Sequence, residues 1–186
     1  MKAIGYQKSL PIENELSLQD IELETPTAHG HDILVEVKAV SVNPVDFKIR
    51  QAMPAAEGEY KVIGWDATGV VKSVGENVSL FKPGDKVWYA GDITRSGSNA
   101  QFQLVDERIV GHMPSSLSYG EAAALPLTSI TAWELLFDRL NVAKNDDSKS
   151  ILVIGAAGGV GSIMVQLLKQ RTKLNIIASA SRAETI

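Results

Sequence analysis

The glycines between residues 155 and 161 form the pattern in this sequence with the clearest chemical meaning. Aligned on its last glycine, GAAGGVG places Ala156, Gly158 and Gly161 at the spacing of a dinucleotide fingerprint, with alanine in the first place. Gly158 would let the backbone approach a pyrophosphate, and the N–H groups at a helix start would bind it. We therefore expect cofactor binding by Ala156, Gly158, Gly159, Val160 and Gly161. The structural alternative is a turn that only lets a helix pack on a sheet.

The residues that follow the next predicted strand indicate which dinucleotide binds. NAD sites usually place Asp or Glu there, which accepts a hydrogen bond from the ribose 2′-hydroxyl. This sequence has Ser181 and Arg182, and no acid before Glu184. Hydroxyl and guanidinium groups suit a 2′-phosphate, so the pattern favours NADPH. The alternative is that Arg182 is solvated and Glu184 binds the ribose.

Metal-ligating residues are few. The chain has no cysteine and three histidines, which excludes thiolate sites and disulfides. His29 and His31 share one loop with Asp32, whereas His112 lies far along the chain. A solvated loop is a better interpretation of the histidine pair than a metal site, so we expect no metal.

The glycine turn needs a strand before it and a helix after it. Residues 151–154 and 175–179 read as strands and residues 159–170 as a helix, which completes a βαβ unit. We expect residues 118–186 to begin a Rossmann doubly wound sheet that is truncated after its second strand. A membrane helix over residues 151–168 is disfavoured because its glycines and polar residues would make a poor spanning helix.

The first part of the chain has a different character. Residues 33–40, 67–74, 86–90 and 100–105 are rich in β-branched residues and are separated by turn signals such as Pro83-Gly84. Near residue 118 the pattern becomes helical, and Ser118 with Glu121 predicts a capping box for a helical run that reaches residue 140. The predicted fold class is α/β with a β-rich, barrel-like N-terminal part.

Composition excludes several classes of partner. The 186 residues are 45% hydrophobic and carry a net charge of −4, so no basic surface for nucleic acid or anionic lipid is expected. The N-terminus lacks the apolar run of a signal peptide. We expect a cytoplasmic protein that acts on a small molecule and has no nucleic-acid or membrane partner.

Four motifs together resemble the medium-chain dehydrogenase/reductase superfamily. They are SVNPVD at residues 41–46, IGWDATGVVKSVGENVSLFKPGDKV at 63–87, LPLTSITAWELL from residue 125, and the glycine turn. The match is closest to the quinone-reductase-like branch, which includes proteins called zinc-type alcohol dehydrogenase-like, and it covers the whole chain. It implies a GroES-like β-barrel domain over residues 1–117 that contacts substrate, and then the Rossmann domain. It also implies a longer, homodimeric full-length protein.

The resemblance implies roles for two residues at the start of a helix. Asn43 is similar to the family residue that faces the nicotinamide and the substrate, and Asp46 is a candidate catalytic carboxylate. The structural alternative is a helix start with Asn43 as N-cap, Pro44 at the first helical position and Asp46 in the first turn.

Three further candidates come from the same resemblance. Lys48 lies near the active-site tyrosine of relatives and could donate to a developing oxygen, although it also reads as a surface residue. Asp66 stands where relatives carry a carboxylate beside zinc; without zinc it would be a buried, hydrogen-bonded residue. Thr131 resembles a hydroxyl near the nicotinamide, and its alternative is a bond to its own helix.

The sequence departs from the zinc-dependent relatives at two places. Asn43 or a neighbour stands where they have a catalytic cysteine, and Gly64-Trp65-Asp66 replaces their Gly-His-Glu. Without a Lewis acid, alcohol oxidation is disfavoured, whereas hydride transfer to a quinone or conjugated enone mainly requires positioning. We therefore predict a zinc-independent, NADPH-dependent oxidoreductase, and no turnover by residues 1–186 alone. The alternatives are a zinc-type alcohol dehydrogenase and a non-catalytic dinucleotide-binding scaffold.

Overall fold

The computed structural model describes residues 1–143 and 148–181, which belong to two compact units, Met1–Pro126 and Leu127–Ile186. The first unit extends beyond the expected boundary at residue 117. The reason is local packing: helix α2 (Tyr119–Ala123) lies against strands β3 (Asp32–Ser41) and β5 (Asp66–Val74). Ser118 caps α2, and the predicted capping box with Glu121 is confirmed.

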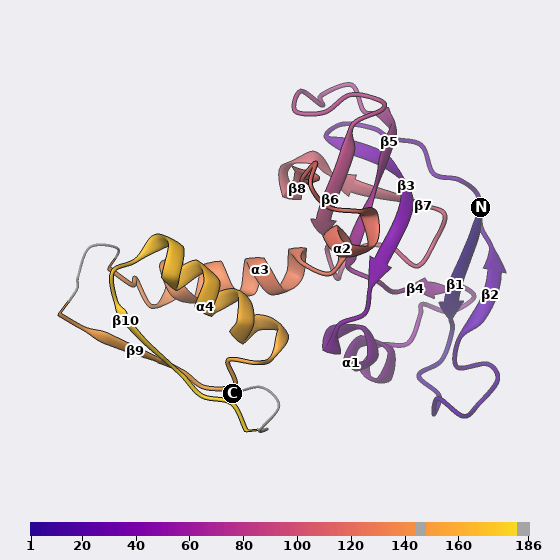
Figure 1. Ribbon diagram of the computed structural model, residues 1–186. Helices are drawn as coiled ribbons and strands as arrows, with labels where there is room; N and C mark the ends of the chain where they lie inside the picture. Colours follow the sequence, from indigo (N-terminus) through magenta and orange to yellow (C-terminus); the bar gives the residue numbers. More distant parts are fainter. Residues whose placement is uncertain (144–147, 182–186) are drawn as a thin grey trace. The chain divides into compact units, whose positions relative to one another are not determined.

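The first unit is built on two antiparallel sheets (Figure 1), which confirms the β-rich N-terminal part of the predicted fold. The larger sheet has the order β7-β3-β5-β6-β8, and the smaller has the order β2-β1-β4. The remaining strands are β1 (Lys2–Tyr6), β2 (Gln19–Glu22), β4 (Lys61–Val62), β6 (Lys86–Ala90), β7 (Phe102–Asp106) and β8 (Val110–His112).

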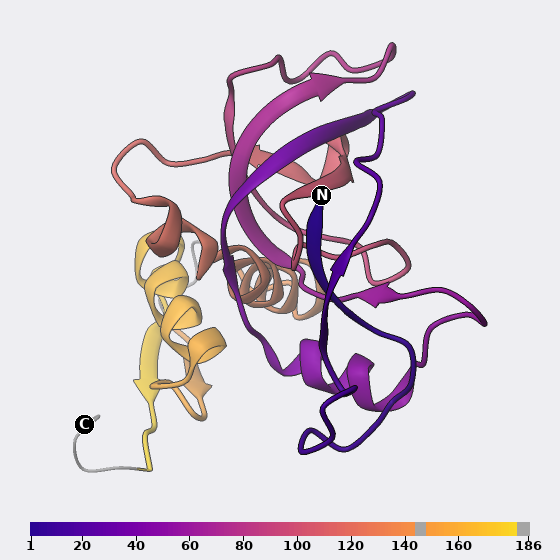
Figure 2. The same cartoon turned by 90° about the vertical axis from the view of Figure 1, so that its right-hand side faces the viewer.

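The pairing of β3 with β5 is irregular at two points. The register skips Lys72 in β5 and Lys38 in β3, so each strand carries one extra residue. Both lysines reach Glu36, with Nζ–Oε distances of 2.6 Å for Lys38 and 3.4 Å for Lys72. Bulges of this kind increase strand twist, and Figure 2 shows how strongly the two ribbons curve.

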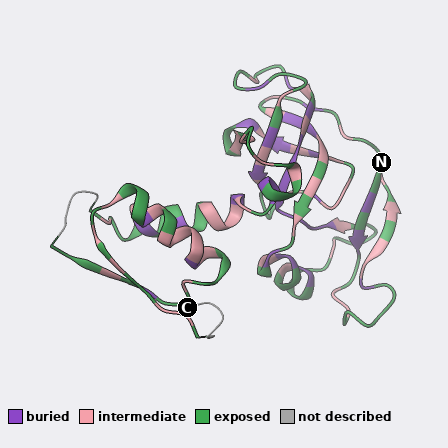
Figure 3. Ribbon diagram, in the orientation of Figure 1, coloured by how far each residue is buried: buried purple, intermediate pink, exposed green. Residues whose placement is uncertain are grey.

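The core of the first unit lies between the curved strands, where Figure 3 shows most of the buried residues. Tyr89 is buried there, and its hydroxyl donates to Gln103 Oε1 at 2.8 Å. Burial raises the pKa of Tyr89 above its ordinary value. The core is apolar apart from such bonded groups; its buried members are Ile33, Val35, Ala67, Val71, Phe81, Val87, Tyr89 and Val105.

A short 3-10 turn, Glu107–Ile109, connects β7 to β8. Glu107 is 2% exposed and accepts hydrogen bonds from the N–H groups of Ser79 and Leu80 at 2.9 and 2.8 Å. His31 lies 3.0 Å from the same carboxylate, so this histidine has a structural contact. These hydrogen bonds, led by the one to His31, lower the pKa of Glu107.

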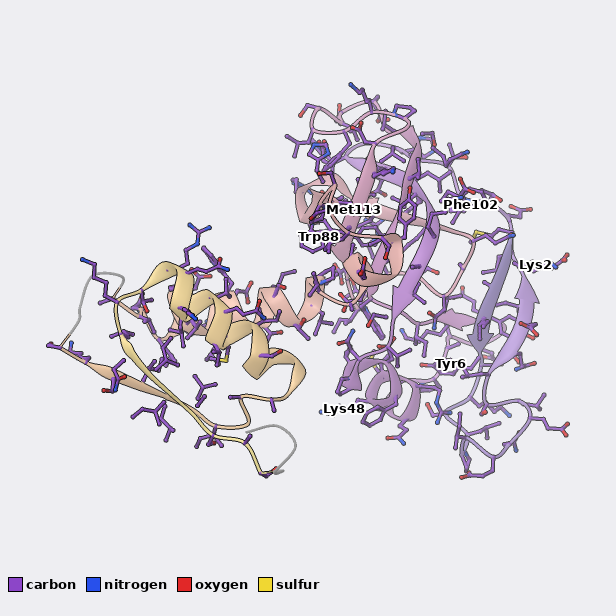
Figure 4. All side chains as sticks on the ribbon, viewed as in Figure 1. Lys2, Tyr6, Lys48, Trp88, Phe102 and Met113 are labelled. Atoms are coloured by element: carbon purple, nitrogen blue, oxygen red, sulfur yellow. The ribbon has the colours of Figure 1, made fainter. Side chains whose placement is uncertain are left out.

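Helix α1 (Pro44–Ala52) buries two charged residues and exposes a large apolar one. Asp46 and Arg50 are buried, while Phe47 is 49% exposed. Arg50 Nη1 donates to Leu10 O at 2.7 Å, and the Tyr6 hydroxyl donates to the carbonyl oxygen of Met53, also at 2.7 Å. Figure 4 labels Tyr6 near this helix. Polar contacts, rather than apolar packing, therefore fix the helix on the unit.

The second unit contains the predicted βαβ arrangement. Strands β9 (Ser150–Val153) and β10 (Asn175–Ala178) are parallel and are connected by α4 (Gly159–Arg171). The apolar stretch from residue 151 is thus a strand, a turn and a helix. Within residues 1–143 and 148–181, none of the helices has the length and apolar character needed to cross a membrane.

The predicted helical run that reaches residue 140 is interrupted near Pro126. Helix α2 ends at Ala123 and α3 (Pro126–Trp133) begins at the proline, because proline lacks an N–H and disfavours a helical residue before it. A π-helical turn, Glu134–Arg139, continues α3, and Asn141 with φ of 49° follows it. Asparagine tolerates this left-handed conformation, which commonly ends helices.

Candidate functional site

The turn between β9 and α4 is tight and held by backbone hydrogen bonds. Gly155 has φ of 71°, a conformation that favours glycine. The Ala156 N–H donates to Ser179 O and the Gly158 N–H to Gly155 O, both at 2.9 Å. The turn therefore fixes where α4 begins and ties the ends of both strands together.

Glycine is required where α4 meets this turn. A Cβ at Gly161 would lie 2.3 Å from Gly155 O, and one at Gly158 would lie 3.3 Å from the same atom. Gly158 is the N-cap of α4, so the N–H groups that follow it begin the helix without intrahelical partners. The bare backbone and the exposed N–H groups fit a dinucleotide pyrophosphate.

A cavity of about 400 Å³ lies beside the turn, at the carboxyl ends of β9 and β10. Ligands of doubly wound sheets bind at this edge. Most side chains that line the cavity are small, and some of them carry hydroxyl groups; they include those of Ala156, Ala157, Ser162, Ala178, Ser179 and Ala180. Ser181 follows it and is exposed, whereas Arg182 lies outside the described residues.

In the first unit, the side chains of Asn43 and Asp66 meet. The β3–β5 register pairs Ser41 with Asp66, so the end of β3 places Asn43 beside the start of β5. Asn43 Nδ2 donates to Asp66 Oδ2 at 2.8 Å, and the residues are 8% and 0% exposed. An ionised carboxylate only accepts hydrogen bonds, which determines which amide atom faces it.

Asp46 is adjacent to this pair and 4% exposed. It forms a capping box with Asn43, whose backbone N–H donates to Asp46 Oδ2 at 2.7 Å, at the helix start that the sequence predicted as the structural alternative. Burial raises the pKa of Asp46, and hydrogen bonds from backbone N–H groups, including that of Gly64, act in the opposite direction. The carboxylate is therefore in contact with backbone, not with open solvent.

The donors around Asn43 do not fit a catalytic zinc ion. Trp65, which replaces the histidine of zinc-dependent relatives, is 2% exposed and its indole N–H is a donor, not a ligand. Asn43 Nδ2 already donates to Asp66. Within the described ranges, no three His, Cys, Asp or Glu side chains converge as a metal site would need.

The other two sequence candidates have simpler surroundings. Lys48 is exposed on α1 (Figure 4). The Thr131 hydroxyl donates to Leu127 O at 2.8 Å, the helix-backbone bond of its structural alternative. The structure thus brings Asn43, Asp46 and Asp66 together, while Thr131 belongs to the second unit.

Sequence reasoning missed three residues that shape these places. Gly155, not Ala156, has the positive φ of the tight turn, and a glycine directly after an apolar strand was the available signal. Gly64 has φ of 107° and lies against Ser98 and Asn99. Ser179 lines the cavity and accepts from Ala156, which only the strand pairing reveals.

Comparison with known proteins places these features in a family. Residues 29–131 match the model of the alcohol dehydrogenase GroES-like domain. A zinc-type alcohol dehydrogenase-like protein of Staphylococcus aureus is 47% identical over 188 residues, covering 100% of this chain and 55% of that protein. The 2-methylene-furan-3-one reductase of Solanum lycopersicum is 37% identical over 187 residues, covering 95% of this chain and 45% of that protein. The chain thus spans about half the length of these relatives.

Solved structures show the same architecture. A protein of Rhizobium etli CFN 42, named provisionally as a zinc-dependent alcohol dehydrogenase, is 61% identical with a TM-score of 0.94, covering 100% of this chain and 54% of that one. The quinone oxidoreductase of Thermus thermophilus, also solved with NADPH, is 26% identical with a TM-score of 0.76. The match covers 100% of this chain and 55% of that one. With the β-rich first unit and the βαβ second unit, these matches show that the chain belongs to the alcohol dehydrogenase GroES-like family of the medium-chain dehydrogenase/reductase superfamily.

Proposed function

We propose that the full-length protein is a zinc-independent, NADPH-dependent oxidoreductase that transfers hydride to a quinone or a conjugated enone. The observation that carries the proposal is the hydrogen bond between Asn43 and Asp66. The resemblance to the family implies that both residues stand near the metal site of zinc-dependent relatives, and in this chain their side chains bond to each other. The glycine turn of the second unit supplies the cofactor side of the proposal.

The cofactor contacts follow from the second unit. Backbone N–H groups at the start of α4 would bind the pyrophosphate, with Gly158 and Gly161 keeping side chains out of its way. The cavity beside β10 would hold the adenosine end, with Ser179 and Ser181 near its ribose. When bound, the nicotinamide supplies the hydride, and the protein supplies orientation.

Acceptor chemistry follows from what the first unit lacks. A carbonyl that must be polarised strongly needs a metal or a comparable electrophile. A quinone or enone is already electrophilic, so donors such as the second N–H of Asn43 and the ammonium of Lys48 provide enough stabilisation of the developing oxygen. Two known proteins of related sequence or structure carry names of this chemistry, the tomato furanone reductase and the Thermus quinone oxidoreductase.

The test uses full-length protein, NADPH and panels of quinones, enones and secondary alcohols. We expect consumption of NADPH with quinones or enones, no loss of activity in chelator, and no stoichiometric zinc by elemental analysis. One zinc per chain with activity lost in chelator would instead support the zinc-type alcohol dehydrogenase that the Staphylococcus name suggests. Cofactor binding without turnover of any acceptor would support the scaffold.

NADPH preference is the finest part of the proposal. Replacing Arg182 by Glu should weaken NADPH binding and narrow its advantage over NADH, because repulsion replaces a charge-assisted phosphate contact. Dissociation constants for both cofactors, measured by fluorescence titration, check this. Equal binding of each cofactor before and after the substitution would assign the 2′-phosphate to other residues.

We also propose that the full-length protein is cytoplasmic and forms a homodimer. We also predict no measurable turnover by residues 1–186 alone, since the chain spans 55% of its Staphylococcus relative and a dinucleotide crevice needs both halves of the sheet. Light scattering of the full-length protein and a quinone assay of both chains check these points.

A further inference from the structure

We propose that Asp46 is a positioning residue: its buried carboxylate holds the turn that carries Asn43 and lies near the turn that leads to Asp66, and thereby sets the orientation of the Asn43 amide. The inference rests on the proposed function for its effect on turnover. The contact network itself lies within the first unit and can be tested without turnover.

The first segment is the turn from β3 into α1. Asp46 Oδ2 accepts the backbone N–H of Asn43 at 2.7 Å, so the carboxylate holds the backbone from which the Asn43 side chain projects. Asn43 Nδ2 then spans 2.8 Å to Asp66. A change at Asp46 therefore reaches Asp66 through a single residue.

The second segment is the turn from β4 into β5. The Gly64 N–H is among the backbone groups that counter the raised pKa of Asp46, and Gly64 lies two residues before Asp66. Gly64 cannot move freely, because even a Cβ there would lie 2.5 Å from Ser98 Oγ and 2.9 Å from Asn99 N. The Ser98 N–H donates to Gly64 O at 2.9 Å, which fixes this turn from its other side.

The raised pKa of Asp46 distinguishes this positioning role from the role of a residue that mainly stabilises the fold. Burial raises the pKa of Asp46, and backbone N–H groups rather than a cation counter it. Arg50, one helical turn later, is directed to Leu10 O. A carboxyl whose folded-state pKa is raised favours folding when protonated, and this contribution is lost as pH rises through the folded pKa. The hydrogen bond that the carboxylate accepts from the Asn43 N–H nevertheless fixes the geometry of the pair.

Asp46→Asn in the full-length protein removes the charge and retains the size. We expect kcat to fall roughly tenfold, because small displacements of positioning groups have effects of this order. We expect KM for NADPH to change less than twofold and the thermal midpoint to stay level or rise. Asp46→Glu restores the charge but displaces the carboxylate, so it should not restore kcat fully. The control is Glu121→Gln, which changes the equivalent capping-box carboxylate of α2, where it is exposed; kcat should not change.

A second readout does not need activity. The side-chain amide protons of Asn43, followed by NMR in full-length protein, should exchange faster in Asp46→Asn while core amides of β5 keep their protection. Unchanged exchange and unchanged kcat would overturn the inference. A loss of kcat accompanied by a lower thermal midpoint and a general loss of amide protection would also overturn it, because Asp46 would then act by stabilising the whole fold. A wild-type protein that turns over no acceptor would refute the proposed function, and the exchange experiment would still decide the role of Asp46.

Discussion

The two units hold their candidate sites by different physical means. In the first unit, hydrogen-bonded side chains form the site: Asn43 donates to Asp66, 23 positions away, and the Asp46 carboxylate accepts the backbone N–H of Asn43. In the second unit, the backbone itself forms the site, and Gly155 and Gly161 matter because they lack side chains. Hydrogen bonds can be weakened gradually by substitution, whereas a space that excludes a Cβ is lost in one step.

The units also differ in how completely they bury their strands. In the first unit, β5 is buried over its first four residues, and its core joins several strands. In the second, Leu152 is 58% and Ile154 80% exposed, and the fully buried core consists of Leu136, Val153 and Leu168. Within residues 1–186, the strands of the second unit are therefore less covered by side chains than those of the first.

The largest effect is expected for Gly161→Ala. The new Cβ would lie 2.3 Å from Gly155 O and 2.8 Å from Ala156 Cα, both backbone atoms, so α4 must move away from the turn. We expect at least about a hundredfold loss of NADPH affinity, and a destabilisation of about 1–3 kcal/mol typical of overpacking. Fluorescence titration and thermal unfolding of full-length protein measure these effects.

The control for Gly161 is Gly120→Ala in α2, where an added Cβ meets nothing within 4 Å. Alanine is the better helix former, so this variant should be more stable by about 0.5–1 kcal/mol and bind NADPH normally. Normal affinity in Gly161→Ala would mean that the turn does not hold the cofactor, and the contrast between the units would fail.

A smaller effect is expected for Asp66→Ala in the first unit. It removes the acceptor of Asn43 Nδ2 and leaves a buried amide unsatisfied, at a cost of about 1–3 kcal/mol. We expect kcat to fall roughly tenfold with cofactor affinity retained, since the glycine turn is not altered. Asp66→Asn keeps an oxygen that can accept and should recover part of the activity. Steady-state kinetics with varied NADPH and varied quinone separate the effect on kcat from the effect on cofactor affinity. An unaltered kcat in Asp66→Ala would remove the pair from the mechanism.

The smallest effect concerns pH and a contact with no catalytic role. The pKa of Glu107 is lowered from 4.5, so its contribution to stability is present above that value and is lost as pH falls through the lowered folded-state pKa. Glu107→Gln should unfold at a lower temperature than wild type near neutral pH. The difference should narrow at acidic pH, where wild type is also protonated. Thermal unfolding across this range checks the sign, and a gap that widens on acidification would contradict it.

Local patterns account for what could be predicted from the sequence. The β-branched residues of β3 and β5, the Ser118–Glu121 capping box and the glycine turn are each local in the sequence. Pro126 carried a local signal as well, since a proline within a helical run marks a helix boundary, yet the helix was predicted to continue through it. Such features depend little on the rest of the fold.

Contacts across the sequence could not be predicted in the same way. Asn43 and Asp66 are 23 positions apart, and their meeting depends on the register of β3 with β5. The place of Asp46 in the first turn of a helix was predicted as an alternative, but its burial was not, because burial depends on the three-dimensional fold. Position 64 was recognised only as part of a family motif, because the left-handed conformation of a glycine does not show in the sequence.

The paired bulges of β3 and β5 determine how the chain can tolerate insertions and deletions. Lys38 and Lys72 each add one residue, and the two offsets cancel, so Ser41 still pairs with Asp66. Because Lys38 is the unpaired extra residue, deleting it alone would leave Val37 opposite Gly69 and Ala39 opposite Thr68, so Ser41 would keep Asp66 as its partner. Only the bulge and the strand twist that it adds would be lost. A genetic screen should therefore find position 38 tolerant of both substitution and deletion, because the bulge residue carries no pairing information for the site.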